Sequence, residues 1–300
     1  MSLTDLRGLV AQAGANDTWY QDPHLPDRPV LLRAARPERY SPTTPLLFVH
    51  HGDLRNGGDY RDYWLLLVDE ANVLVAVPEF PASTYPGAAW YNLGNRVDET
   101  GRTKPREQWT YGVPGRLFAS LRSQGVTARR SYGLFGHSSG GQFVHRMISL
   151  GFRDSVAAAA TANAGTYAMP DLDITFPHGL EATEIDEAAL RALLAFRLTV
   201  FAGTADIDTT SEYSRVIMRR CSKGRRATRG RIPISRPLAT RPASAGWLVH
   251  GQSSMSPVSG MTERKCLQLP LQFWRRRCTL RNSDLISMNT TRRISSRRAG

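Results

Sequence analysis

Several hallmarks of membrane and disulfide-rich secreted proteins are missing from this chain of 300 residues. Three cysteines are too few for the disulfide framework of a small secreted domain. No run of apolar residues reaches the ~18 that a membrane span needs. The first residues, Met1-Ser2-Leu3-Thr4-Asp5-Leu6-Arg7, lack the basic and then apolar form of a signal peptide. We therefore expect a cytoplasmic protein with no membrane partner.

Acidic residues and tyrosines are scarce in the last part of the chain. Residues 218–300 hold 19 of the 39 Lys and Arg but only 2 of the 26 Asp and Glu. The first 217 residues therefore carry 20 basic and 24 acidic side chains, together with all ten tyrosines. All three cysteines, Cys221, Cys266 and Cys278, follow them. The net charge of +13 thus belongs to a basic tail of low order, 218–300, and residues 1–217 form the globular domain.

One short motif, Gly136-His137-Ser138-Ser139-Gly140, has the spacing G-x-S-x-G. A β-prone segment, 131–135, precedes it, and a helix is predicted over 141–150. Strand, tight turn and helix are the context of a nucleophile elbow, which lifts a serine off the end of a strand. Its glycines allow the turn because a Cβ would collide with the neighbouring strand and helix. The alternative is a glycine-rich loop in which Ser138 is an ordinary turn residue.

Buried strands alternate with amphipathic helices through the first 202 residues. Strands are predicted over 45–50, 72–78, 131–135, 156–161 and 196–202, and helices over 60–70, 109–121, 141–150 and 185–194. Residues 79–107 are expected to form a long loop, and Pro114 to interrupt its helix early. Strands separated by helices over this many units predict an α/β fold with a mostly parallel, doubly wound sheet.

Acyl transfer by a serine needs a base for the Oγ proton, an acid to orient that base, and N–H donors for the oxyanion. One donor is the backbone N–H of Ser139, the residue after the nucleophile. The turn His50-His51-Gly52-Asp53 is expected to supply the second donor. We assign it to Asp53, with Gly52 as the alternative. His51 is expected to hold its own loop and not to act as the base.

The acid is expected in the turn after the strand at 196–202. Gly203-Thr204-Ala205-Asp206 places a carboxylate there, so Asp206 is the candidate and Asp208 the competitor. Either aspartate could instead be a residue that caps an Asx-turn. We expect no metal and no cofactor.

Three segments together carry a resemblance to a known family: Phe48-Val49-His50-His51-Gly52, the run from Tyr132 to Arg146, and Gly203-Thr204-Ala205-Asp206. They resemble the α/β-hydrolase superfamily, and most closely its bacterial esterases and polyhydroxybutyrate-depolymerase-like members. The resemblance covers residues 20–217 or so. It implies an α/β-hydrolase fold and hydrolysis of a small-molecule or polyester ester by a Ser-His-Asp triad. It also implies the chain order Ser, then acid, then His.

The histidine that this order requires has no suitable candidate. Only His250 follows Asp206, in Leu248-Val249-His250-Gly251, and the sequence predicts no strand, turn and helix around it. We therefore expect a serine hydrolase that lacks its base, its last strand and its last helix. The strand at 196–202 would then be an exposed edge, and the chain would show poor solubility and little activity.

The composition of the tail is typical of a GC-rich gene read out of frame. Methionine has a single codon, ATG, so a shift by one base rereads Met261-Thr262 as Asp and allows His before it. With G or C at the wobble positions, Ser254 to Thr262 can become Val-Asp-Val-Pro-Gly-Val-Gly-His-Asp, which looks like the missing strand and His turn. The hypothesis is a frame shift near residues 214–218.

Other readings of the sequence remain open. Six aromatic residues in and after the long loop either line an acyl pocket or pack the loop onto the domain: Phe80, Tyr85, Trp90, Tyr91, Trp109 and Tyr111. An inactive pseudo-hydrolase that only binds ligands would keep the same elbow.

The basic tail contains clusters such as Arg275-Arg276-Arg277, which would bind phosphates. It has no recognisable nucleic-acid-binding motif, so no specific nucleic acid is expected.

Overall fold

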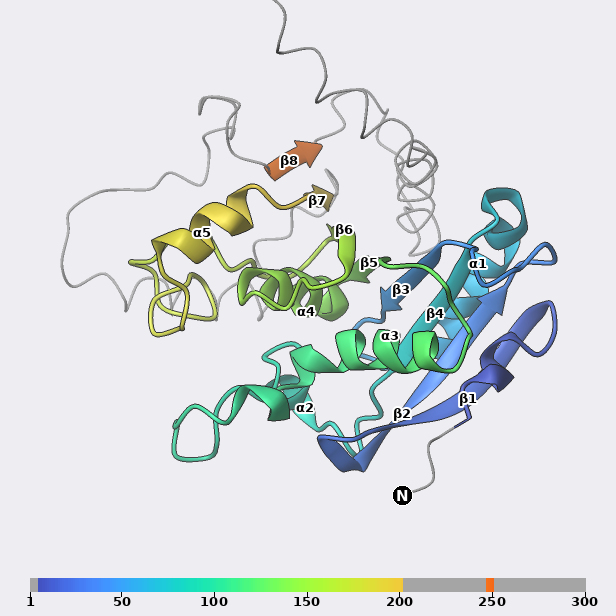
Figure 1. Ribbon diagram of the computed structural model, residues 1–300. Coiled ribbons are helices and arrows are strands. Elements are labelled where there is room, and N and C mark those ends of the chain that lie inside the picture. The colour runs from blue at the N-terminus through green and yellow to red at the C-terminus, as the bar shows by residue number, and fades with distance from the viewer. Residues whose placement is uncertain (1–4, 202–246, 251–300) are drawn as a thin grey trace, which may run out of the picture. The chain divides into compact units, whose positions relative to one another are not determined.

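One sheet organises the residues that the structure describes, which are 5–201 and 247–250 of a computed structural model (Figure 1). These residues all belong to the unit Met1–Gly260. The eight strands follow the order β1-β2-β4-β3-β5-β6-β7-β8. Their bounds are β1 Gly14–Asp22, β2 Leu25–Arg36, β3 Leu46–His50, β4 Leu74–Glu79, β5 Tyr132–His137, β6 Val156–Ala162, β7 Leu198–Phe201 and β8 Trp247–His250.

The sheet is mostly parallel, as the alternation of strands and helices predicts. The strands from β4 through β3, β5, β6 and β7 to β8 pair in parallel, whereas β1 and β2 are antiparallel. Every residue of β3 and β5 is buried. Strands covered by helices on both faces read as continuous apolar runs, which is why the sequence revealed these strands.

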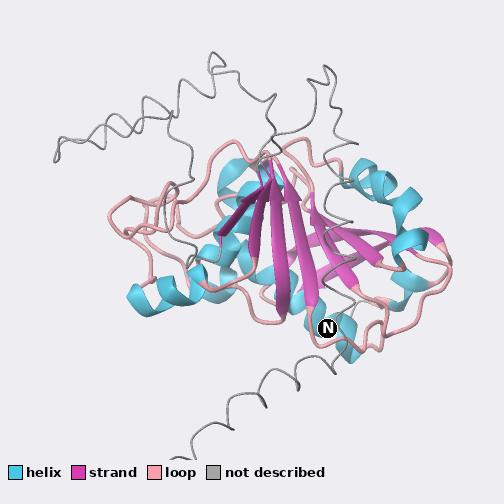
Figure 2. Ribbon diagram, turned by 90° about the horizontal axis from the view of Figure 1, so that it is seen from above, coloured by secondary structure: helices cyan, strands magenta, loops and turns pink. Residues whose placement is uncertain are grey.

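Helices lie on both sides of the strands (Figure 2). They are α1 Gly57–Ala71, α2 Gly87–Trp90, α3 Val113–Ser123, α4 Ser139–Ser149 and α5 Glu187–Leu194, with 3-10 turns at Arg7–Val10, Arg106–Gln108 and Thr110–Gly112. On one face, Phe48 and Leu134 join a buried cluster with Phe118 of α3 and Phe143 of α4. On the other face, Trp64 of α1 meets Phe135 edge-on at 5.9 Å. Successive residues of β5 thus face the helices on opposite sides of the sheet.

Pro114 does not interrupt a helix, contrary to the expectation for residues 109–121. Helix α3 begins at Val113, which places the proline in its first turn. The missing N–H of a proline is harmless there, because first-turn N–H groups have no partner inside the helix. Before it, Thr110–Gly112 form a separate 3-10 turn, and Trp109 lies outside both elements.

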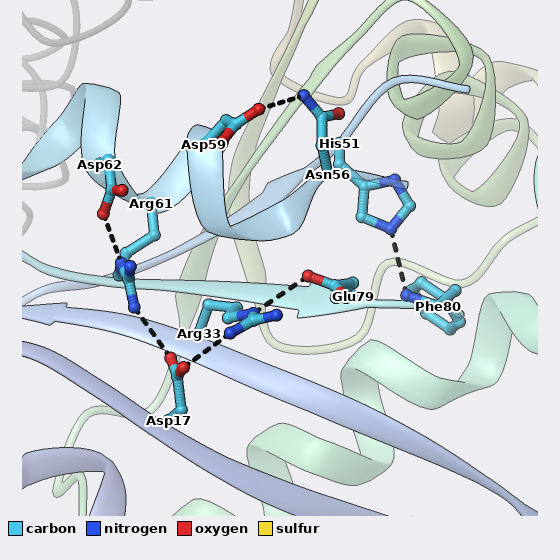
Figure 3. Close-up of polar contacts among 9 residues, drawn as sticks. All are labelled: Asp17, Arg33, His51, Asn56, Asp59, Arg61, Asp62, Glu79 and Phe80. Atoms are coloured by element: carbon cyan, nitrogen blue, oxygen red, sulfur yellow. Dashed lines mark hydrogen bonds and ion pairs between the residues drawn. The ribbon is translucent and has the colours of Figure 1, made fainter. Parts of the chain in front are cut away.

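The hairpin of β1 and β2 was not expected from the sequence. β1 is largely polar and β2 contains two prolines, so neither has the apolar run of a buried strand. Ion pairs hold this part of the sheet together: Arg33 bonds Asp17 at 2.7 Å and Glu79 at 3.0 Å, and Arg61 of α1 reaches Asp17 at 2.9 Å (Figure 3). Ion pairs thus join the hairpin to β4 and α1, in addition to the backbone pairing of β2 with β4.

A buried ion pair fixes the far end of the hairpin. Asp22, which is fully buried, accepts from Arg116 Nε of α3 at 2.8 Å and 3.0 Å. It also accepts from the backbone N–H of His24 at 2.9 Å. These bonds offset the cost of burying the carboxylate and lock the turn between β1 and β2 onto α3.

The strand β8 corrects the expectation that β7 is an exposed edge and that the last strand is missing. Trp247–His250 pairs in parallel with β7, from Leu198↔Trp247 to Phe201↔His250. The physical reason is that Trp-Leu-Val is a short apolar, β-prone run inside an otherwise polar and basic tail. The expected missing helix and the remainder of the basic tail lie outside the described residues.

Candidate active site

The elbow lies between β5 and α4, as predicted. Ser138 has φ 54° and ψ −121°, a backbone conformation that residues other than glycine rarely adopt. Such a residue costs ~1–3 kcal/mol and persists only where its surroundings enforce it. Its own N–H donates to Ala162 O at 3.0 Å, and its carbonyl accepts from Gln142 N–H at 3.0 Å. Ser138 is therefore held in a strained turn between the end of β6 and the first turn of α4.

Two glycines of the motif allow the close approach that the turn needs. A Cβ on Gly136 would lie 2.2 Å from Gly140 O, and a Cβ on Gly140 would lie 2.2 Å from His50 O. Both obstacles are backbone atoms, which cannot swing aside. The pattern G-x-S-x-G is thus required here by packing of α4 against β3 and β5.

Ser138 is partly exposed, whereas its neighbours in the elbow are buried. It follows β5 at the carboxyl edge of the sheet, because His50 pairs with Gly136 and Ala162 with His137 at the ends of their strands. Ligands of open α/β sheets bind at this edge. Among the described residues, none forms a hydrogen bond with Ser138 Oγ.

The structure places the two residues that are predicted to supply the oxyanion donors, Asp53 and Ser139, next to each other. A Cβ built on Gly52 would lie 3.8 Å from Ser138 Cβ, so the turn after β3 lies against the serine. Ser139 Oγ donates to Asp53 Oδ1 at 3.4 Å, a long bond that joins the residue after the nucleophile to that turn. Ser139 also opens α4, whose N-terminal N–H groups favour negative charge. The residues assigned to the oxyanion therefore meet beside Ser138.

His51 holds its own loop, as expected, and both of its ring nitrogens are engaged. Nδ1 donates to Gly52 O at 2.9 Å. Nε2 accepts from Phe80 N–H at 3.1 Å (Figure 3). Burial lowers the pKa of His51 to about 3. A fully buried, neutral imidazole with both nitrogens committed cannot take a proton from Ser138.

The turn at residues 50–53 is called the oxyanion turn from here on. A stack of side chains that the sequence did not predict supports it. Tyr91 stacks on His51 with centroids 4.7 Å apart, and its hydroxyl donates to His51 O at 2.8 Å. The buried guanidinium of Arg55 lies 4.2 Å over Tyr91 and donates to Phe80 O and Gly87 O at 3.1 Å and 3.0 Å. The only signal in the sequence was an arginine two residues after the His51-Gly52-Asp53 turn.

The other histidines near the elbow are also built into the core. His145 Nδ1 donates to Gly141 O at 2.8 Å, and its Nε2 accepts from Ala168 N–H at 2.8 Å. His137 Nδ1 lies 2.8 Å from Tyr60 Oη. Burial lowers the pKa of His50, stacked on Phe143 at 4.5 Å, to about 3 and does the same for His145. These rings are structural parts of β3, β5 and α4.

The acid and the base of the predicted triad are not brought together by the described residues. Asp206 and its competitor Asp208 lie outside them. The backbone of His250 ends β8 and pairs with Phe201, at the same carboxyl edge as the elbow. Within the described ranges, no group of three His, Cys, Asp or Glu side chains is arranged to hold a metal ion. Likewise, no helix in that part of the chain is long and apolar enough to cross a membrane.

The aromatic residues of the long loop mostly pack it onto the domain. All but one of the six have no exposed surface: Phe80, Tyr85, Tyr91, Trp109 and Tyr111. Only Trp90 keeps partial exposure. The packing alternative therefore holds for the group, and an acyl pocket lined by all six is excluded.

Comparisons with known proteins agree with this architecture. The poly(3-hydroxybutyrate) depolymerase LpqC from Bordetella parapertussis is 29% identical, with a TM-score of 0.74 over 96% of this chain and 99% of that one. Poly(aspartic acid) hydrolase-1 from Sphingomonas sp. KT-1 is 28% identical, with a TM-score of 0.70 over 87% of this chain and 98% of that one. No protein-family model and no curated protein matches. The chain has the α/β-hydrolase fold, and both of these structural neighbours are hydrolases.

Proposed function

We propose that this chain derives from a carboxyl-ester hydrolase that works by acyl transfer to Ser138. The observation that carries the proposal is the strained backbone of Ser138 at the carboxyl edge, with Asp53 and Ser139 beside it. Ser138 Oγ would attack the ester carbonyl, and the backbone N–H groups of Ser139 and Asp53 would stabilise the oxyanion. Release of the alcohol leaves an acyl-Ser138 ester, which water then hydrolyses to the free acid.

Deprotonation of Ser138 Oγ needs a base, and the structural histidines around the elbow do not supply one. We propose that the intended base and the final helix are encoded in another frame, so that this chain keeps Ser138 and Asp206 but is impaired. The break in charge, tyrosine and cysteine content at residues 217–218 supports this. A coding sequence that shows an intact frame with AT-rich wobble bases through 254–262 would contradict it.

His250 is the specific alternative, because the register Phe201↔His250 puts its backbone at the edge of the sheet where the elbow lies. Hydrolysis of p-nitrophenyl butyrate separates the two cases. We expect this chain to turn the ester over hardly faster than Ser138→Ala does, and His250→Ala to change nothing. Turnover that both substitutions abolish would make His250 the base and would contradict the frame-shift proposal.

A fluorophosphonate that reacts with activated serines tests for an inactive ligand binder. If a pseudo-hydrolase is correct, neither this chain nor a chain with the frame restored is labelled at Ser138. If the proposed hydrolase is correct, the restored chain is labelled, and Ser138→Ala removes the label. Mass spectrometry of the peptide that contains Gly136–Gly140 gives the result directly.

A further inference from the structure

A small pocket of about 200 Å³ lies between the β1–β2 turn and the long loop that contains α2. Six polar or charged residues and three apolar residues line it: His24, Leu25, Pro26, Asp27, Arg28, Trp90, Asn95, Lys104 and Gln108. Trp90 is the one aromatic residue of that loop which the domain core does not take up completely. The pocket therefore accounts for the exposure of Trp90.

The pocket lies at the same edge of the sheet as Ser138. Leu31 pairs with Glu79, the last residue of β4, so residues 25–30 extend past the carboxyl end of that strand. A chain of aromatic contacts runs from the oxyanion turn to the pocket. The centroid distances are 4.7 Å for His51–Tyr91, 5.4 Å for Tyr91–Phe80, 5.0 Å for Phe80–Tyr85 and 6.3 Å for Tyr85–Trp90. A continuous run of aromatic ring contacts thus joins His51, in the turn beside Ser138, to the pocket.

Two cations lie on the indole of Trp90. The Arg28 guanidinium carbon is 3.5 Å and Lys104 Nζ is 4.7 Å from the ring centroid. Arg28 also donates to Thr84 O, and Lys104 Nζ donates to Asn95 Oδ1 at 2.6 Å. Asn95 is itself buried, and its Nδ2 donates to Gln108 O at 3.1 Å. Neutral acceptors and one ring therefore hold both cations in place.

Among the described residues, neither of the two cations forms an ion pair. Asp27 is the one carboxylate in the lining, so the pocket keeps a net positive charge. Like charges close to one ring repel each other, and an anion bound in the pocket would relieve that repulsion. A guanidinium takes a carboxylate through two parallel N–H···O bonds, and the indole offers methylene groups a flat apolar wall.

We propose that this pocket binds the terminal carboxylate of an acid-ended oligoester whose ester group lies at Ser138. The proposal rests on the proposed ester hydrolysis, and it names the substrate class: oligomers that carry a free acid, in preference to neutral esters. Each round of ester hydrolysis releases a new carboxylate end, so the products of one cleavage bear the group that the pocket recognises.

Adipate, a six-carbon dicarboxylate, is the probe, and isothermal titration calorimetry measures its binding to the chain. We expect saturable binding that neutral dimethyl adipate does not show. Lys104→Met should weaken adipate binding about tenfold or more, as loss of a charged hydrogen-bond donor does. Arg130→Ala is the matched control, because it removes an exposed cation just before β5, at the opposite edge of the sheet, and should leave the affinity unchanged.

Asp27→Asn should change the affinity for adipate in the opposite direction. Because it removes the acid from the pocket lining, adipate should bind about twofold to fivefold more tightly. A misfolded variant cannot bind more tightly, so this result guards against loss of structure. Equal binding of dimethyl adipate, no effect of Lys104→Met, or weaker binding to Asp27→Asn would overturn the proposal. Inorganic phosphate that binds as tightly as adipate would overturn the assignment to carboxylates.

Failure of the pocket and failure of the proposed function are distinguishable. Adipate binding does not need a reactive serine, so Ser138→Ala should bind adipate as the unsubstituted chain does. If the restored chain is never labelled at Ser138 while adipate still binds, ester hydrolysis is wrong and the anion pocket stands. If labelling succeeds and adipate does not bind, the proposed function stands and the pocket is wrong.

Discussion

Gly140 is one of the two elbow positions at which an added side chain would collide with backbone atoms, and its substitution by alanine tests the packing of the site. An added Cβ would lie 2.2 Å from His50 O and 2.5 Å from His51 O. Real Cβ atoms essentially never approach a heavy atom below 3.0 Å. Because both obstacles are main-chain carbonyls of β3 and the oxyanion turn, α4 would have to move outward by about 1 Å, a shift that tightly packed interiors resist.

The cost of that movement is set by the overpacking of a dense interior. Inserted methyl groups cost ~1–3 kcal/mol, and an obstacle made of backbone puts Gly140→Ala at the upper end, ~3 kcal/mol. Urea unfolding followed by tryptophan fluorescence measures it. With a slope of ~2–3 kcal/mol per M for a domain of this size, the midpoint should fall by about 1 M.

Gly115→Ala is the matched control on α3, where an added Cβ meets nothing within 4 Å. Alanine restricts the unfolded chain and suits a helix better than glycine does, so this variant should gain ~0.5–1 kcal/mol. The two substitutions add the same methyl group and should move the urea midpoint in opposite directions. A Gly140→Ala midpoint equal to that of the unsubstituted chain would refute the geometry of the elbow.

The remaining predictions concern pH and charge. Burial lowers the pKa of His50, His51 and His145 to about 3. Below pH 6.5 these histidines therefore bind protons in the unfolded chain but not in the folded chain. The free energy of unfolding is thus full above pH 6.5 and falls as the pH drops. At pH 5 the loss is on the order of 2 kcal/mol per histidine, and equal urea midpoints at pH 7 and pH 5 would contradict it. Asp22→Asn leaves Arg116 without its buried carboxylate and should cost ~2–3 kcal/mol, whereas Glu187→Gln, in an exposed pair with Arg191, should cost below ~0.5 kcal/mol in the same urea assay. Equal losses of unfolding free energy in the two variants would show that burial of the Asp22–Arg116 pair does not add to stability.

The parallel core could be predicted from the sequence because its strands are buried on both faces. Leu46–His50, Leu74–Glu79 and Tyr132–His137 are continuous apolar runs, and each is followed by a recognisable helix or turn. The hairpin of Gly14–Asp22 and Leu25–Arg36 could not, because long-range ion pairs and the ladder with β4 hold its polar and proline-containing strands in place. Such contacts leave no local pattern.

The candidate site divides in the same way. Ser138 and Ser139 belong to one local motif and Asp53 to a His-Gly turn, so all three could be proposed as site residues from the sequence. Arg55 and Tyr91 support the turn from 36 positions apart in the sequence, which no local pattern reveals. The strand β8 was missed because its four residues stand alone in a basic context.

Restoring the reading frame near residues 214–218 tests the central claim most directly. The measurement is the rate of p-nitrophenyl butyrate hydrolysis by the restored chain, by its Ser138→Ala variant and by the chain with the present tail. The account predicts that kcat rises by about 10⁴-fold or more on restoration, as expected when a missing triad base is supplied, and that Ser138→Ala abolishes the gain. A restored chain no faster than the present one, or a gain that survives Ser138→Ala, would contradict it.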